Sequence, residues 1–73
     1  MTHRARILKM LASLPTRGRQ PQSCARTVLE GMARTPQDRH AAAALIDYML
    51  ALGELVPYGG PRNRTFGLPR RAR

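Results

Sequence analysis

The first apolar stretch of the chain has the spacing of an amphipathic helix. Between residues 3 and 14 the apolar positions lie three or four residues apart or side by side, at Ile7, Leu8, Leu11 and Leu14. Thr2 precedes the stretch and is a suitable N-cap residue. Pro15 disfavours helical geometry at the residue before it, so we expect the helix to end there.

A second helix is expected from Gln22 to Ala33, after a basic loop at residues 15–21 that contains Pro and Gly as helix breakers. Ser23 is its expected cap, and Gly31 weakens its last turn. Its apolar stripe consists of Ala25, Val28, Leu29 and Met32.

The third helix has the clearest start signal. Thr35 is a good N-cap, Pro36 occupies the first helical position, and Asp38 follows the cap by three residues. The residues expected to face the core are Ala42, Leu45, Ile46, Met49 and Leu52. Gly53 is the expected C-cap, which makes this helix the longest and most hydrophobic element of the domain.

Beyond Gly53 the pattern predicts a β-hairpin. Residues 55–58 form its first strand, residues 59–64 its turn and residues 65–68 its second strand. Pro57 lacks a backbone N–H, so the first strand should lie at the edge of a sheet. The tail at residues 69–73 is expected to be disordered.

The composition indicates one small domain with a polyanionic partner. The chain has 73 residues and a formal net charge of +9, and 12 of its 13 basic residues are Arg. Arginine is well suited to phosphate and carboxylate groups, so a basic domain of this kind is typical of nucleic-acid binding. A GC-rich genome would explain the preference for Arg over Lys but not the shortage of acids.

The charge is not spread evenly along the chain. Residues 1–29 carry +6 and residues 55–73 carry +5, whereas residues 30–54 carry −2. Arg26, Arg34 and Arg39 are either solvated or partners of Glu30 and Asp38; the sequence leaves both interpretations open. The positive charge therefore belongs to the two ends of the chain, away from the third helix.

Several function classes are disfavoured. Two Tyr, one Phe and no Trp give little material for a base-stacking surface. The single Cys24 and the two histidines lack the spacing of a metal site or of a catalytic pair, and the four acids are scattered, so we expect no enzyme activity, metal or cofactor. One unpaired cysteine suits a reducing cytoplasm, and no apolar run is long enough to span a membrane. The basic residues 1–14 could also serve as a mitochondrial presequence.

Three short helices followed by a hairpin with Gly and Arg at its tip resemble a winged helix-turn-helix domain. The resemblance is most specific from Ala44 to Leu68, where the last helix runs through Gly53-Glu54-Leu55-Val56 into the wing. Val28-Leu29 followed by Gly31 corresponds to the scaffold helix, and Thr35-Pro36 to the turn. The expected fold is mainly α with a small β-hairpin: one winged-helix-like domain over residues 1–68, followed by the basic tail.

The resemblance implies particular contacts with DNA. In such domains the third helix enters the major groove, which makes Gln37, Arg39 and His40 the base readers. The wing would contribute Arg62, Asn63 and Arg64. Basic residues of the two ends are further candidates for binding nucleic acid or a partner: Arg4, Arg6, Lys9, Arg17, Arg19, Arg70 and Arg71.

The third helix departs from the family pattern, because it carries Asp38, Asp47 and a run of four alanines but only one firm positive charge. We therefore favour a small basic transcription regulator that binds RNA polymerase and nearby nucleic acid. In size and charge layout it resembles phage-encoded factors that bind host polymerase and alter initiation or termination, including antitermination. The alternatives are an operator-binding repressor and a non-specific DNA- or RNA-binding protein.

Overall fold

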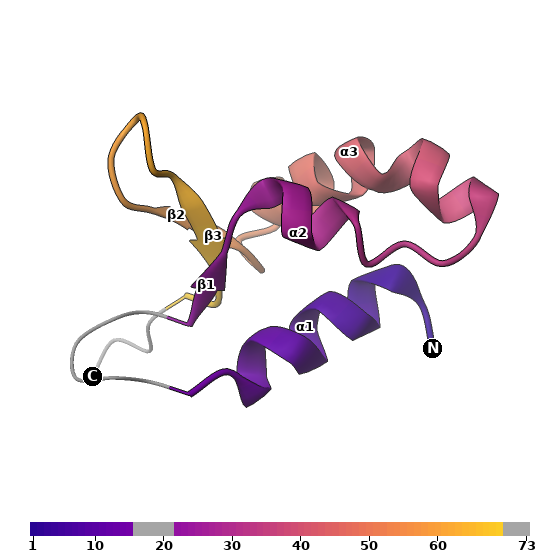
Figure 1. Cartoon of the computed structure of the whole chain (residues 1–73), viewed down its shortest axis with the longest axis horizontal. Coiled ribbons are helices and arrows are strands. Elements are labelled where there is room, and N and C mark those ends of the chain that lie inside the picture. Colours follow the sequence, from indigo (N-terminus) through magenta and orange to yellow (C-terminus); the bar gives the residue numbers. More distant parts are fainter. Residues whose placement is uncertain (16–21, 70–73) are drawn as a thin grey trace.

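The computed structural model describes residues 1–15 and 22–69. Its elements are α1 (His3–Ser13), β1 (Ser23–Cys24), α2 (Arg26–Glu30), α3 (Pro36–Ala51), β2 (Val56–Tyr58) and β3 (Thr65–Gly67). The strands form one antiparallel sheet in the order β1-β3-β2. Figure 1 shows α1 beneath α2 and α3, with the small sheet at one end of the helical layer. The described chain is thus a small domain of three helices and a three-stranded sheet.

The start signals read from the sequence are confirmed at α1 and α3. Thr2 Oγ1 accepts a hydrogen bond from the Ala5 N–H at 3.1 Å, and Thr35 Oγ1 accepts one from the Asp38 N–H at 3.0 Å. Each hydroxyl satisfies one backbone donor that the first turn of a helix leaves without a partner. Pro36 occupies the first turn of α3, where its missing N–H costs nothing.

The end of α3 is closed by the expected glycine. Gly53 has a φ of 77° and follows the C-cap residue Leu52. The Glu54 N–H donates to the Met49 carbonyl at 3.0 Å, and the Gly53 N–H donates to the Leu50 carbonyl at 3.1 Å. This pair of bonds is the Schellman arrangement, which turns the chain sharply from α3 toward β2.

The expected second helix, Gln22 to Ala33, was too long. α2 is confined to Arg26–Glu30, and Ser23 and Cys24 form a strand that pairs with Gly67 and Phe66. The Ser23 hydroxyl does not cap a helix; it hydrogen-bonds the Thr65 hydroxyl at 2.8 Å. A side chain at Gly67 would place its Cβ 2.1 Å from the Gln22 carbonyl oxygen, so this pairing requires glycine there.

The hairpin is confirmed, with each strand one residue shorter than expected. Val56 pairs with Gly67, Pro57 with Phe66, and Tyr58 with Thr65. β2 lies at an edge of the sheet, as Pro57 requires.

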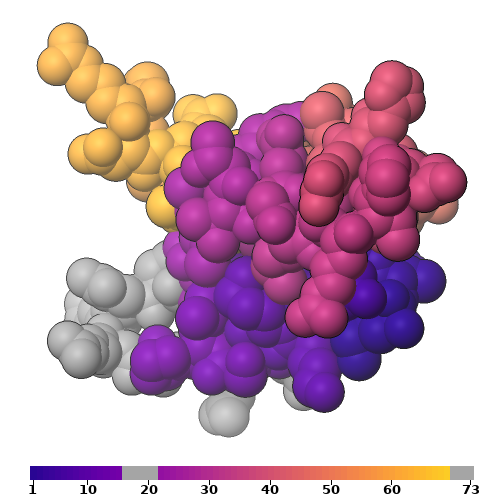
Figure 2. Space-filling view, turned by 45° about the vertical axis from the view of Figure 1, so that its right-hand side comes forward, coloured from indigo at the N-terminus to yellow at the C-terminus, as the bar shows by residue number. Residues whose placement is uncertain are grey.

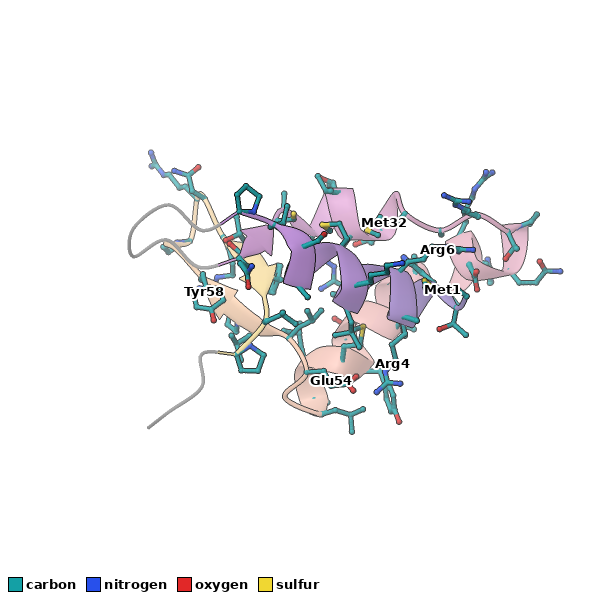
Figure 3. The ribbon with its side chains drawn as sticks, turned by 90° about the horizontal axis from the view of Figure 1, so that it is seen from below. Met1, Arg4, Arg6, Met32, Glu54 and Tyr58 are labelled. Atoms are coloured by element: carbon teal, nitrogen blue, oxygen red, sulfur yellow. The ribbon has the colours of Figure 1, made fainter. Side chains whose placement is uncertain are left out.

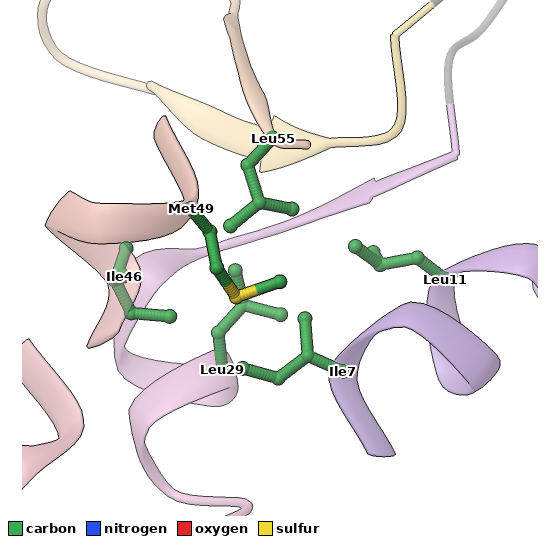
Figure 4. Close-up of a cluster of buried hydrophobic side chains, with 6 residues drawn as sticks. All are labelled: Ile7, Leu11, Leu29, Ile46, Met49 and Leu55. Atoms are coloured by element: carbon green, nitrogen blue, oxygen red, sulfur yellow. The ribbon is translucent and has the colours of Figure 1, made fainter. Parts of the chain in front are cut away.

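Six fully buried side chains form the core, and they converge in Figure 4. They come from all three helices and from the residue that precedes β2: Ile7, Leu11, Leu29, Ile46, Met49 and Leu55. Five residues of the third helix were expected to face the core, and the prediction for Leu52 was wrong, because 52 % of this residue is exposed. The chain reverses direction at Gly53, so Leu55 fills the end of the core and Leu52 lies outside it.

His3 is the buried polar residue that joins α1 to α2. It is 3 % exposed, and its Nε2 lies 2.8 Å from the Leu29 carbonyl oxygen. Because a carbonyl can only accept, the proton must be on Nε2. Nδ1 is also buried and has no hydrogen-bond partner within residues 1–15 and 22–69. This histidine therefore serves the fold by satisfying a carbonyl at the end of α2.

The position of Leu52 gives a test of the core. We expect Ile46→Ala to lower the free energy of unfolding by about 2–5 kcal/mol, because it leaves a cavity in a fully packed site. Leu52→Ala at the same low protein concentration should change it by no more than about 0.5 kcal/mol. Urea denaturation followed by circular dichroism measures both, and equal losses would contradict the assignment of Leu52 to the surface.

Candidate nucleic-acid and partner interface

The tip of the β2–β3 hairpin is held in a defined shape. The Asn63 N–H donates to the Gly60 carbonyl at 3.2 Å, which closes a turn over residues 60–63. Gly59 has a φ of 82°, and a Cβ there would lie 2.6 Å from the Asn63 carbonyl oxygen. At the base of the hairpin the Tyr58 hydroxyl donates to the Leu68 carbonyl. The tip is therefore a constrained turn rather than an open loop.

This turn presents Arg62, Asn63 and Arg64 to solvent. All three are exposed, and neither arginine forms an ion pair with any residue in 1–15 or 22–69. Figure 2 shows the tip (orange, upper left) standing clear of the rest of the described chain. Two guanidinium groups with free donors on a projecting turn are well suited to contact phosphate oxygens.

The two arginines near the start of α1 have different environments. Arg4 Nε donates to Glu54 Oε1 at 2.7 Å, and Arg4 Nη2 also contacts Glu54 Oε2. This hydrogen-bonded contact raises the pKa of Arg4 and lowers the pKa of Glu54. Figure 3 shows Arg6 on the opposite side of α1, the side on which Met32 lies. Arg4 is therefore engaged within the fold, and Arg6 is directed away from Glu54.

Lys9 extends the surface of Arg6 along α1. It is exposed and lies one turn after Arg6, which is half-buried, so the two charges share one side of the helix. Neither forms an ion pair with a residue in the described part of the chain. Arg6 and Lys9 form a second basic surface, separate from the hairpin tip.

The expected base readers lie in the first two turns of α3, and all are exposed. Gln37 and His40 are one turn apart and share a face, whereas Arg39 is offset from His40 by about 100° around the helix axis. Figure 1 shows that α3 begins at the end of the molecule opposite the hairpin tip. The structure therefore does not gather these residues and the hairpin arginines into one compact cluster.

Arg26 is occupied by two acids. Its Nε lies 2.8 Å from Glu30 Oε2, its Nη2 lies 3.0 Å from Asp47 Oδ1, and Nη2 also donates to the Ala43 carbonyl at 3.0 Å. The hydrogen bond with Glu30 is the main cause that raises the pKa of Arg26. The partnership of Arg26 with Glu30 is confirmed, and the contact with Asp47 joins α2 to α3. Arg26 is thus a structural arginine.

Arg34 was not selected from the sequence as a binding residue. It is exposed in the segment between α2 and α3 and forms no ion pair with residues 1–15 or 22–69. Its neighbour Thr35 is the α3 cap, so the cation precedes the turn that also carries Gln37 and Arg39. A lone cation before a capping residue gives no distinctive sequence signal. Arg17, Arg19, Arg70 and Arg71 lie outside the described residues.

The remaining candidate chemistry is sparse. Cys24 Sγ lies 3.9 Å from Met10 Sδ, and burial raises the pKa of the thiol, which disfavours the reactive thiolate. Within residues 1–15 and 22–69 no three His, Cys, Asp or Glu residues are grouped as metal ligands, and no helix there has the length and hydropathy to cross a membrane. No family model, curated protein or solved structure matches the chain.

The hairpin tip offers a test with a matched control. Gly59→Ala should destabilise the turn by roughly 1–3 kcal/mol, because alanine meets both a backbone clash and an unfavourable positive φ. Gly60→Ala has open space around its Cβ and a φ outside the left-handed region, so the turn should survive. Backbone NMR shifts of residues 58–65 provide the measurement. A Gly59→Ala spectrum as close to wild type as that of Gly60→Ala would contradict the constrained turn.

Arg4 and Arg6 can be separated by the same substitution. Arg4→Gln should lower the melting temperature because it removes the partner of Glu54, whereas Arg6→Gln should leave it nearly unchanged. The Glu54 pKa is lower in the folded chain than in the unfolded chain. The stability that this ion pair contributes is therefore fully present at pH values above the ordinary glutamate pKa. It is lost as the pH falls through the lowered pKa that Glu54 has in the folded chain.

The pH dependence is tested by measuring the melting temperatures of the wild type and of Glu54→Gln between pH 7 and pH 3 and taking their difference at each pH. The difference should shrink as the solution becomes more acidic. A difference that stays constant over that range would show that the pair contributes no pH-dependent stability.

Proposed function

We propose that this protein is a non-enzymatic transcription regulator with a winged-helix-like domain that holds nucleic acid mainly by its phosphate backbone. The fold assignment is supported by the chain order of helix, short strand, two helices and hairpin, in which β1 joins the free edge of β3. In this interpretation α3 is the helix nearest the major groove and the β2–β3 hairpin is the wing.

The observation that carries the proposal is the projecting turn with Arg62 and Arg64 free of ion pairs in the described chain. The described acids do not balance the cations evenly: Glu54 holds Arg4, while Glu30 and Asp47 hold Arg26. The wing and the Arg6–Lys9 surface keep their full charge. Such charges bind phosphates and release counterions, which gives affinity without sequence information.

Base reading by α3 is a weaker interpretation. Beyond His40 its exposed residues include Ala43, Ala44 and Asp47, which offer no cation and few donors to base edges. Arg39 and Gln37 also leave the helix in different directions. These features favour positioning on the backbone over the recognition of an operator.

The salt dependence of binding tests the role of the wing. Each lost phosphate contact lowers the slope of log affinity against log salt by about 0.9, so Arg62→Ala/Arg64→Ala should reduce it by roughly 2. Arg62→Lys/Arg64→Lys keeps both charges and should retain the wild-type slope. Fluorescence anisotropy with unrelated duplexes between 50 and 200 mM salt gives the slopes. An alanine variant with the wild-type slope would refute the wing as a phosphate-binding element.

RNA polymerase is the second candidate partner, and the poor base-reading surface of α3 favours it. A regulator that contacts only the phosphate backbone cannot select a DNA site by itself. Binding to RNA polymerase can direct it to the site where it acts. Nuclease-treated host extract should yield polymerase on the immobilised wild-type protein at moderate salt. Polymerase that is recovered from untreated extract but not from nuclease-treated extract would leave nucleic acid as the partner. Recovery of neither polymerase nor nucleic acid from untreated extract would exclude both roles.

A further inference from the structure

Four arginines that form no ion pair with residues 1–15 or 22–69 lie in two groups along the longest dimension of the described chain, which is 37 Å. Arg62 and Arg64 are at the hairpin tip, at one end of the molecule in Figure 1. Arg34 lies just before α3, at the other end, where the first half of α1, with Arg6, passes beneath the chain. We call Arg62 and Arg64 the wing end, and Arg6 and Arg34 the α3 end.

The two ends share one side of the molecule. Figure 3 shows the hairpin turn and the segment between α2 and α3 along the same edge, and Arg6 and Met32 lie toward that edge. The ion pair of Arg4 with Glu54 lies toward the opposite edge. A single partner that covers one side of the molecule can therefore reach both ends.

The acids of the chain do little to offset these cations. Three of the four acids are held by Arg4 or Arg26. The fourth, Asp38, is half-buried in the first turn of α3 and forms no ion pair with the described residues. Its charge weakens the attraction of an anion to the α3 end but does not occupy Arg6 or Arg34 by contact.

The distance between the two ends is similar to the repeat of double-stranded DNA. One turn of B-form DNA is about 34–36 Å long, and the backbone returns to the same side of the duplex after each turn. The described chain is 37 Å long in the same direction as the separation of its two ends. Phosphates one turn apart can therefore contact the wing end and the α3 end at the same time.

A duplex suits this arrangement better than a single strand. A duplex is stiff over about 150 bp, so it holds two phosphates one turn apart without being ordered by the protein. Binding of single strands usually depends on aromatic side chains on which bases stack. Tyr58 and Phe66 are half-buried in the sheet, and exposed Tyr48 is close enough to Arg4 to interact with it electrostatically, toward the opposite edge. Within the described residues, the side that carries both ends thus has no exposed aromatic ring.

We propose that the protein lies along double-stranded DNA, with the wing end and the α3 end bound to backbone phosphates about one helical turn apart. This inference rests on the proposed binding of nucleic acid through its phosphates, and it adds Arg6 and Arg34 as phosphate ligands. It also explains why the hairpin and the start of α3, the two elements assigned to DNA, lie far apart. Only the first turns of α3 approach the groove, which agrees with the absence of Lys and Arg in α3 after Arg39.

The length of the duplex tests simultaneous contact. A 16-bp duplex is about 54 Å long and reaches both ends, whereas an 8-bp duplex is about 27 Å long and reaches one end at a time. With 16 bp in about 0.1 M salt, Arg34→Gln should weaken binding about eightfold, the loss expected for one phosphate contact. With 8 bp it should weaken binding by no more than about twofold, because the wing end still binds. Fluorescence anisotropy of the full chain, at a low temperature that keeps the short duplex paired, measures both affinities.

Arg4→Gln is the matched control, because it removes the same charge from the opposite edge of the molecule. It should change both affinities by no more than about twofold. Equal losses for Arg34→Gln with the two duplexes, or a loss no greater than that of Arg4→Gln, would overturn the two-ended contact. A 16-nucleotide single strand that binds as tightly as the 16-bp duplex would overturn the choice of double-stranded DNA. Thermal melts establish that both variants are folded at the temperature of the measurement.

The wing variant Arg62→Ala/Arg64→Ala separates this inference from the proposed function. Weaker binding of the 16-bp duplex by the wing variant, but not by Arg34→Gln, would support the wing as a phosphate-binding element and reject the α3 end. Unchanged binding by both variants would reject the two proposals together.

Discussion

The other features of the structure depend on the packing of α1 against the rest of the core. Two residues of α1, Ile7 and Leu11, pack there against Leu29, Ile46, Met49 and Leu55. A chain of 73 residues buries a limited share of its surface, so no element is stable without this contact. α2 has a single turn and a half and one fully buried residue, Leu29. The hairpin is attached to the same core through Leu55, which leaves its tip free to project.

The features that were read correctly from the sequence are local ones. Thr2, Thr35 and Gly53 act through backbone groups within a few residues, so their chemistry is visible in a short stretch of sequence. The edge position of β2 also follows from one residue, Pro57. These positions establish α1, α3 and the hairpin without reference to distant parts of the chain.

The features that were missed depend on distant partners. β1 has two residues, and it exists because β3, more than forty residues later, pairs with it. Arg4 looked like one more cation of a basic end, but Glu54, fifty residues away, engages it. Arg4 and Arg6 are the same residue type on the same helix, so no sequence pattern distinguishes the structural one from the one directed outward. The exposed charges of the candidate site could be proposed from composition, but their division into engaged and free groups could not.

Pro57 has a consequence for the behaviour of the sheet itself. Along an antiparallel strand the backbone N–H and C=O groups of successive residues point alternately toward the partner strand and away from it. In a three-residue strand the central residue therefore points its N–H and C=O away from the partner when its two neighbours point theirs toward it. With Val56 and Tyr58 bonded toward β3, the outward position of β2 belongs to a residue without an N–H. The exposed rim of the sheet therefore offers no amide donor at the point where an additional strand would begin to pair. The opposite rim is β1, which is too short to template a ribbon. Fibrous, strand-by-strand growth is thereby discouraged at both margins of the sheet.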